Sequence, residues 1–278
     1  MGITLRLGAF LIIAAVLPGA EDPREIVRRS TEENRRTEKL AESYTYIERQ
    51  DERSFDSRGR TQRHALKSYD VTRTEGSPYS RLIARDDKPL PPDEERAERQ
   101  KLEKSIVQRR AETPAQREKR LSDWRRKREH EREFLREVPD AFAFRLAGEE
   151  TLDGRRVYVI DATPRSDFKP RSNDGKLLTK MKGRLWIDAQ TYDWAKAEAE
   201  TVDTISFGGF ALRVGPGTRF TLEQVRVNDE IWLPKQVTVT YQARLLLVKR
   251  LAGQVDYTYS DYKKFQSDSR IVATEPAR

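Results

Sequence analysis

The C-terminal half of the chain, residues 180–265, is built almost entirely from segments with the pattern of β-strands. Residues 183–188, 225–228, 237–241 and 255–259 are rich in β-branched and aromatic side chains, and helical periodicity is nearly absent between them. Short turns join successive segments, so neighbouring strands must pair antiparallel. A sheet of this length cannot bury its apolar side alone. The sequence therefore predicts a sheet that curls around its own interior or is covered by helices.

Alternation with a period of two indicates which side of this sheet is apolar. On a predicted strand over 194–207, Ala195, Ala197 and Ala199 share one side. On another, over 231–244, four apolar residues share a side: Val237, Val239, Tyr241 and Ala243. One apolar and one polar side are typical of a single-layer sheet with solvent outside. The small alanines leave room on the inner side for a packed helix or for a bound molecule.

Before this sheet, the chain is predicted to form one helix and three strands. Pro23 suits the first turn of a helix, and a sparse apolar stripe continues to residue 42. Strands are predicted over 44–55, 61–74 and 79–85, with turns at 56–60 and 86–89. After residue 140 the predicted strands are 143–149, 155–162, 180–188, 194–207, 212–214, 218–228, 231–244 and 245–262, with a polar loop over 164–176.

Residues 92–137 differ abruptly from the strands on either side. They contain no glycine and are dense in Arg, Lys and Glu. The pattern predicts two helices, about 93–111 and 114–137, the second capped by Thr113 with Pro114 in its first turn. Their apolar residues form only narrow stripes, so we expect these helices to lie on the sheet as an inserted pair rather than to form a core.

The two ends of the chain are predicted to lie outside the folded domain. Arg6, an apolar run over 7–17 and small residues at 19 and 20 are typical of a cleaved secretory signal, and the run is too short to cross a bilayer comfortably. Residues 21–266 are predicted to form a single domain, and 267–278 a flexible polar tail. The mature protein is therefore expected to be exported, in the periplasm or outside the cell.

The composition excludes several classes of site. The chain has no cysteine, which excludes disulfides, thiolate metal sites and thiol nucleophiles. Its net charge is +8, but both signs are mixed along most of the sequence, so no nucleic-acid partner is predicted. The densest basic run, 125–128, lies between acidic residues. We interpret it as a solvated, ion-paired helix face, with peripheral contact to an anionic membrane surface as the alternative.

No catalytic, metal or cofactor site is predicted. Of the two histidines, His64 lies in the middle of a predicted strand and has no acidic or serine signature nearby. His130 begins a zinc-protease-like pattern, but Phe134 occupies the position of the second histidine. Nucleophile-elbow, phosphate-loop and dinucleotide patterns are absent from the sequence. The chain is therefore not expected to be an enzyme; an envelope hydrolase would need a nucleophile–base pair that the sequence does not offer.

Several segments carry a resemblance to a known family. They are Tyr-Thr-Tyr at 44–46, Gly-Arg-Leu-Trp-Ile-Asp at 183–188 followed by Trp194 and Lys196, and Tyr-Ser-Asp-Tyr-Lys-Lys-Phe at 259–265. With an N-terminal helix, a long antiparallel sheet and inserted helices, the chain resembles the LolA/LppX/RseB superfamily over about 23–90 and 140–266. The charged insertion at 92–137 departs from the compact carriers of that family.

The resemblance implies an α+β fold, in which a large curved antiparallel sheet forms an incomplete β-barrel with an N-terminal helix. The inserted helical pair would be the lid. It also implies an envelope binding protein that holds a lipid, an acyl chain or a lipoprotein in an apolar cavity, in a carrier or sorting role. Burying a fourteen-carbon chain contributes roughly 11 kcal/mol at about 0.8 per methylene. Association costs start at about 4 kcal/mol, so such a site needs no specific polar contact.

Strand alternation gives a set of residues predicted to line this cavity. They are Leu185, Ile187, Ala195, Ala197, Ala199, Phe220, Leu222, Val237, Val239, Tyr241 and Leu245. The alternative for each is an ordinary core position under the helices. The alternative function is a sensor or protein-interaction module of the same fold that binds a peptide or lipid signal without transporting it. In that case the helices at 92–137 would contact an envelope protein partner.

Overall fold

The computed structural model describes residues 21–208, 211–246 and 248–265. The predicted signal at 1–20 and the predicted tail at 267–278 lie outside the described residues. Within them the strands are β1 (Tyr44–Phe55), β2 (Thr61–Thr74), β3 (Ser77–Arg85), β4 (Lys88–Pro89), β5 (Phe142–Leu152), β6 (Arg155–Pro164), β7 (Met181–Asp188), β8 (Trp194–Thr201), β9 (Ile205–Phe207), β10 (Leu212–Val214), β11 (Arg219–Val227), β12 (Ile231–Leu245) and β13 (Lys249–Lys264).

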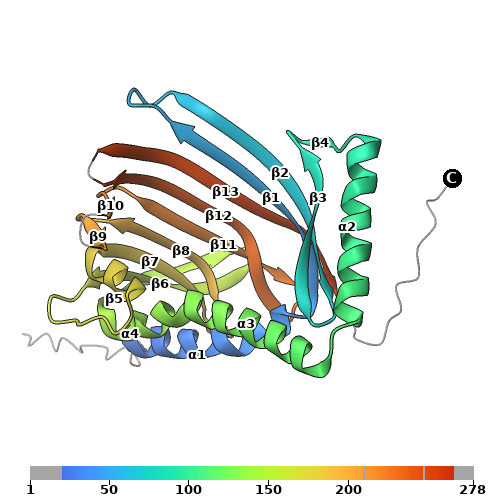
Figure 1. Ribbon diagram of the computed structural model, residues 1–278. Coiled ribbons are helices and arrows are strands. Elements are labelled where there is room, and N and C mark those ends of the chain that lie inside the picture. The colour runs from blue at the N-terminus through green and yellow to red at the C-terminus, as the bar shows by residue number, and fades with distance from the viewer. Residues whose placement is uncertain (1–20, 209–210, 247, 266–278) are drawn as a thin grey trace, which may run out of the picture.

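All these strands belong to one antiparallel sheet (Figure 1). The strand order is β4-β3-β2-β1-β13-β12-β11-β8-β7-β6-β5, and the β9–β10 hairpin adds to β12 beyond the end of β11. The sheet curves strongly but does not close, since the path through the described strands ends at β4 on one edge and β5 on the other. The predicted α+β fold with an incomplete barrel is thus confirmed.

The helices are α1 (Pro23–Ala41), α2 (Pro92–Arg110), α3 (Pro114–Glu133) and the short α4 (Val138–Ala141), with 3₁₀ turns η1 (Phe134–Glu137) and η2 (Asp174–Lys180). The three predicted helices are confirmed. Thr113 caps α3 in a capping box, accepting from the Gln116 amide at 3.3 Å while its own amide donates to the Gln116 side chain at 2.9 Å. No described helix is long and apolar enough to span a membrane.

The main core lies between α1 and the β5–β8 part of the sheet. Ile26 and Val27 of α1 are fully buried against Ile160 and Ile187, and α4 and η2 close the cluster. The indole N–H of Trp194 donates to the buried Ser30 hydroxyl at 2.9 Å, which fixes α1 on β8. We call the side of the sheet that faces α1 the inner face.

Strand register extends the inner face well beyond this core. Cross-strand partners lie on the same side of a sheet. Ala197, which belongs to the core, pairs with Leu222, which pairs with Val237, which pairs with Tyr257. A second row runs parallel to it through Ala162, Gly183, Ala199, Phe220, Val239 and Val255. The inner face therefore continues from β6 to β13 as an apolar surface.

One residue of the predicted inner row lies on the other side. Trp186 pairs with Lys196 but Ile187 pairs with Trp194, so Ala195 is the extra residue of a β-bulge. Ala195 instead packs in an outer cluster with Val157, Val159, Trp186 and Trp232. The prediction that three alanines of this strand share one face is wrong for Ala195, because the bulge inverts the alternation there.

Two further predictions about the strands need correction. The predicted strand over 194–207 is two strands, because the chain turns after Thr201, where the Val202 amide donates to the Lys180 carbonyl at 2.8 Å. The predicted turn at 86–89 contains β4, a two-residue strand on the edge next to β3.

Asp188 ends β7 and organises the turn into β8. Its carboxylate is fully buried and accepts from the Gln190 and Thr191 amides at 2.8 and 3.0 Å. It also forms an ion pair with the Arg155 guanidinium. Burial opposes ionisation, but these hydrogen bonds and the Arg155 charge outweigh it and lower the pKa of Asp188. The last residue of the Gly-Arg-Leu-Trp-Ile-Asp segment therefore has a structural role.

Candidate functional site

The predicted cavity residues divide according to what covers the inner face. Leu185, Ile187 and Ala197 are buried in the main core beneath α1 and α4, with exposed fractions of 7, 0 and 5%. They form packed core rather than the wall of an open space. The strand sequences alone could not separate them from the other predicted residues, because the alternation is the same in both parts of the sheet.

Apart from Leu222, the other predicted residues on the inner face are not packed into any buried cluster. We call this part the trough; it consists of Ala199, Phe220, Leu222, Val237, Val239, Tyr241, Val255 and Tyr257, all half-buried. Leu222 touches the edge of the main core, and the rest extend away from it across β12 and β13. Val255 and Tyr257 were missed from the sequence, although the alternation along 255–259 was visible. The trough is an apolar surface that stays partly open to solvent.

A cavity of about 550 Å³ lies where β5, β6, β7, β8 and β11 run side by side. Its lining is centred on the row Phe144, Ala162, Gly183, Ala199 and Phe220, so it shares two residues with the trough. Its volume is within the range of about 300–1,000 Å³ that ligand sites occupy. Three small residues between two phenylalanines leave that space.

The charged residues that also line this cavity are paired with one another. Arg184 donates to Asp161 at 2.7 Å, and Arg145 pairs with the same carboxylate. Glu200 lies 3.5 Å from Arg219 and 3.8 Å from Lys182. These pairs satisfy the charges of adjacent strands and supply no acid–base couple.

Tyr241 lies at the far end of the trough, over a glycine. A β-carbon added to Gly253, its partner on β13, would lie 2.5 Å from the Tyr241 hydroxyl oxygen and 2.5 Å from the Arg53 carbonyl oxygen. Only glycine leaves room for the tyrosine at this point. Gly253 therefore allows the ring of Tyr241 to lie against the sheet.

Beyond the trough, tyrosines dominate the inner face. Tyr46 lies 5.7 Å from Tyr259 and 5.6 Å from Tyr262, measured between ring centroids. Burial raises the pKa of Tyr259 and Tyr262, and the nearby Glu48 carboxylate raises both further. Glu48 accepts a hydrogen bond from Gln50 at 2.5 Å but forms no ion pair with any described residue. This tyrosine-rich part of the inner face is thus amphipathic, whereas the trough is purely apolar apart from tyrosine hydroxyls.

Helix α3 runs beside α1 along one end of the sheet (Figure 1). It contacts the sheet through residues spaced at helical intervals: Leu121 lies against Gly76, and Trp124 stacks 5.0 Å from the Arg73 guanidinium. Arg132 of α3 pairs with Glu38 of α1. The inserted helices therefore bridge β2, β3 and α1, while the trough across β11–β13 remains partly exposed.

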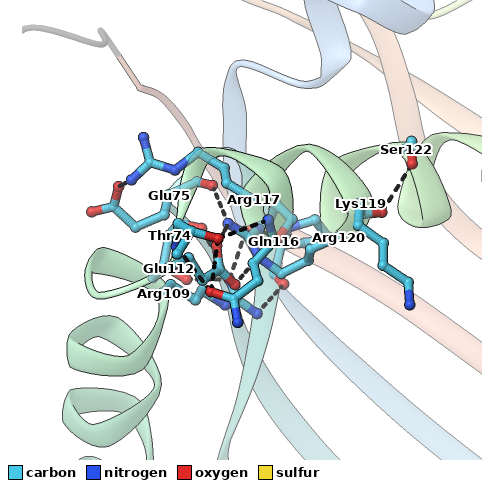
Figure 2. Close-up of polar contacts among 12 residues, drawn as sticks. Thr74, Glu75, Arg109, Glu112, Gln116, Arg117, Lys119, Arg120 and Ser122 are labelled. Atoms are coloured by element: carbon cyan, nitrogen blue, oxygen red, sulfur yellow. Dashed lines mark hydrogen bonds and ion pairs between the residues drawn. The ribbon is translucent and has the colours of Figure 1, made fainter.

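Two arginines clamp the α2–α3 corner to the β2–β3 turn (Figure 2). Arg109 donates to the carbonyls of Thr74 and Ser77 at 2.9 and 3.2 Å. Arg120 donates to the Ser77 hydroxyl at 2.7 Å and to the Glu75 carbonyl at 3.0 Å. It also makes a two-point contact with Glu112 and lowers the pKa of that carboxyl. Sequence reasoning missed this clamp because its arginines look like any others in a charged helix.

Arg120→Met is expected to loosen this corner, because it leaves Glu112 and the Glu75 carbonyl without their shared partner. We expect the free energy of unfolding to fall by about 1–3 kcal/mol. We also expect faster hydrogen exchange of the backbone amides in α2 and α3. The matched control is Arg125→Met on the same helix, whose exposed pair with Glu118 is worth about 0–1 kcal/mol. Equal exchange in both variants would show that the clamp does not hold the helices.

Leu245 does not line the trough. It is 38% exposed at the end of β12, next to Leu246 at 58% and near Val248 at 84%. The sequence predicts strands at 231–244 and 245–262 with no turn between them, because a continuous apolar run has the pattern of a strand. In the structure the chain reverses there, with the Val248 amide donating to the Leu245 carbonyl at 3.2 Å.

The basic run at 125–128 is largely ion-paired. Arg125 lies 2.6 Å from Glu118, and Arg126 pairs with Asp123. This favours the solvated helix face over the membrane contact at this position. His130 is exposed near Glu133, and His64 lies 2.9 Å from Asp51 beside Arg53 in an ion-pair cluster. The residues that the structure describes contain no group of acidic or histidine side chains suited to a metal ion.

Comparison with known proteins gives similarity only among solved structures, since no family model and no curated protein matches. A domain assigned to outer membrane lipoprotein sorting, from Vibrio parahaemolyticus, is 13% identical with a TM-score of 0.33, over 88% of this chain and 95% of that chain. A LolA superfamily protein from Nitrosomonas europaea is 12% identical with a TM-score of 0.31, over 92% and 99%. A chain of the Pseudomonas aeruginosa MucA/MucB complex is 10% identical with a TM-score of 0.24, over 88% of this chain and 99% of that chain.

The first two of these structures carry the lipoprotein-sorting and LolA names that the sequence resemblance leads one to expect. Their identities and TM-scores are too low to carry an argument about function. The function is therefore argued from the residues of this chain.

Proposed function

We propose that this chain is an exported binding protein that holds the acyl chain of a lipid, or of a lipid-modified protein, in the trough. The observation that supports the proposal is the half-buried state of the trough residues. Val239 pairs with Val255, and Val237 lies two residues before Val239 on the same side of β12, yet these three valines belong to none of the buried clusters. Covering an apolar surface of this kind with a bound molecule lowers the free energy, because apolar area is removed from water.

The energetics fit a guest that is recognised by shape and apolarity. Each buried methylene contributes about 0.8 kcal/mol, so a chain of ten or more carbons offsets association costs that start at about 4 kcal/mol. The charged residues nearby are already paired among themselves. No polar group of the trough has to recognise a headgroup for such a chain to bind.

The alternative role, a sensor that contacts a partner through α2 and α3, fits the surface less well. Helix α2 has no buried residue, and much of its exposed face consists of ion pairs such as Arg96–Asp93 and Arg99–Glu95. Protein interfaces are typically depleted in charge at their centre. The trough therefore favours carriage, and the partner role of the helices stays a prediction.

The proposal is tested by titrating the purified protein with an apolar fluorescent probe, N-phenyl-1-naphthylamine, and displacing the probe with a long-chain fatty acid. Saturable enhancement that the fatty acid reverses supports an acyl-chain site. A protein that neither enhances the probe nor binds the fatty acid has no usable trough, and the sensor role then becomes the better hypothesis.

A further inference from the structure

The β12–β13 turn combines exposed apolar side chains with positive charge. Of the six large apolar side chains that are exposed in the described part of the chain, three lie here: Leu245, Leu246 and Val248. The Leu246 amide donates to the Ala211 carbonyl at 2.9 Å, which holds the turn against the β9–β10 hairpin. Leu245, Leu246 and Val248 are therefore exposed to solvent next to a backbone contact that holds Leu246 on the neighbouring strands.

Basic residues flank these apolar side chains on both strands. Arg244 precedes them, Lys249 and Arg250 follow, and Arg213 of β10 pairs in register with Arg244. All four are exposed, and none forms an ion pair with another residue that the structure describes. Most arginines of α2 and α3 have a carboxylate partner, whereas these four positive charges have none within the described part of the chain. The turn thus carries uncompensated charge around an apolar tip.

We propose that this turn is a membrane-docking tip that inserts into the surface of an anionic lipid bilayer. Leu245, Leu246 and Val248 would enter the boundary between headgroups and acyl chains, where exposed apolar side chains leave water. The four basic residues would contact the anionic headgroups around them. Near such a surface each basic residue is worth about a fivefold gain in partitioning. Neither contribution depends on which guest the trough holds.

The inner face connects this tip to the trough. Val239, Tyr241, Ala243 and Leu245 alternate along β12, so they share one side of the strand. Leu251 of β13 pairs with Ala243 and widens the same surface. An acyl chain that leaves the bilayer at the tip would meet continuous apolar surface up to Val239. In Figure 1 the end of β12 and the start of β13 lie near β9 and β10, at the end of the sheet away from α2.

Single labelled cysteines test insertion directly, because the chain has no cysteine of its own. Val248→Cys carries an environment-sensitive NBD dye on the tip, and Val107→Cys on α2, which is 66% exposed, carries it at a control position. With phosphatidylcholine vesicles that contain phosphatidylglycerol, we expect a blue shift and stronger emission at 248 but not at 107. Neither variant alters a buried side chain, so both are expected to fold.

Charge and apolar contributions are separated by sedimentation with the same vesicles. Arg244→Gln/Lys249→Gln/Arg250→Gln is expected to weaken binding about 100-fold, and Leu245→Ser/Leu246→Ser at least about tenfold. Removing three cations from α2 by Arg96→Gln/Arg99→Gln/Lys104→Gln is the matched control and should change binding little. The proposal is overturned if the dye at 248 does not respond, if both dyes respond equally, or if the α2 control weakens binding as much as the tip variant. Loss of probe binding in the trough with vesicle binding intact would refute carriage and leave the tip standing.

Discussion

Val239→Asp is expected to abolish acyl-chain binding while the sheet stays folded. Val239 lies in the middle of the trough, paired with Phe220 on one side and Val255 on the other. A carboxylate there would lose its water whenever an acyl chain covered it, with no cation in the row to compensate. We expect affinity for the apolar probe to fall by about 100-fold or more. Because the position is half-buried in the free protein, the substitution should cost little stability.

The control is the next residue on the same strand. Thr240 points to the outer face, where it pairs with Arg219 and Gln254. Thr240→Asp introduces the same charge beside an arginine and should leave probe binding unchanged. Equal loss in both variants would mean that the charge acts through the fold, and unchanged binding in Val239→Asp would place the guest elsewhere.

Asp188→Ala is expected to give the largest loss of stability among single polar substitutions in the sheet. It removes the buried partner of Arg155 and the acceptor for the Gln190 and Thr191 amides. Breaking such a buried pair costs about 3–5 kcal/mol. The control, Asp203→Asn, removes an exposed pair with Lys180 and should cost about 0–1 kcal/mol. Urea unfolding of both variants at neutral pH measures the difference.

The carboxylate of Asp188 also makes the stability of the fold depend on pH, in a direction that its pKa determines. The folded-state pKa of Asp188 lies below its ordinary value of about 4. The contribution of Asp188 to the free energy of unfolding is therefore complete above pH about 4. It is lost as the pH falls through the lower, folded-state pKa. The gap in unfolding free energy between the wild type and Asp188→Ala should shrink in that acidic range. A gap that stays constant down to the acid transition would contradict the assigned role of Asp188.

Much of the fold follows from local pattern. The period-two alternation along 237–241 and 255–259 predicts adjacent strands with one apolar face, and the structure pairs Val237 with Tyr257. Thr113 followed by Pro114 predicts the start of α3, which begins there. These features are local because the physical preferences that produce them act within a few residues.

The coverage of the inner face could not be predicted in the same way. Leu185 and Val239 have the same strand pattern, but only Leu185 lies under α1, and that depends on where the helix crosses the sheet. Ala195 lies on the opposite side because of a β-bulge, and nothing in the local sequence around this alanine predicts the bulge. Leu245 belongs to a turn whose apolar residues resemble strand. In each case a tertiary contact, rather than a local preference, decides the position.

Native mass spectrometry tests the central claim most directly, with the protein produced in a host that has membranes. The account predicts a folded protein that carries an acyl-bearing species, which is released on unfolding and recovered in a lipid extract. It also predicts that Val239→Asp emerges without that species and that Thr240→Asp retains it. A wild-type protein that emerges bare and also fails to take up the apolar probe would contradict the account.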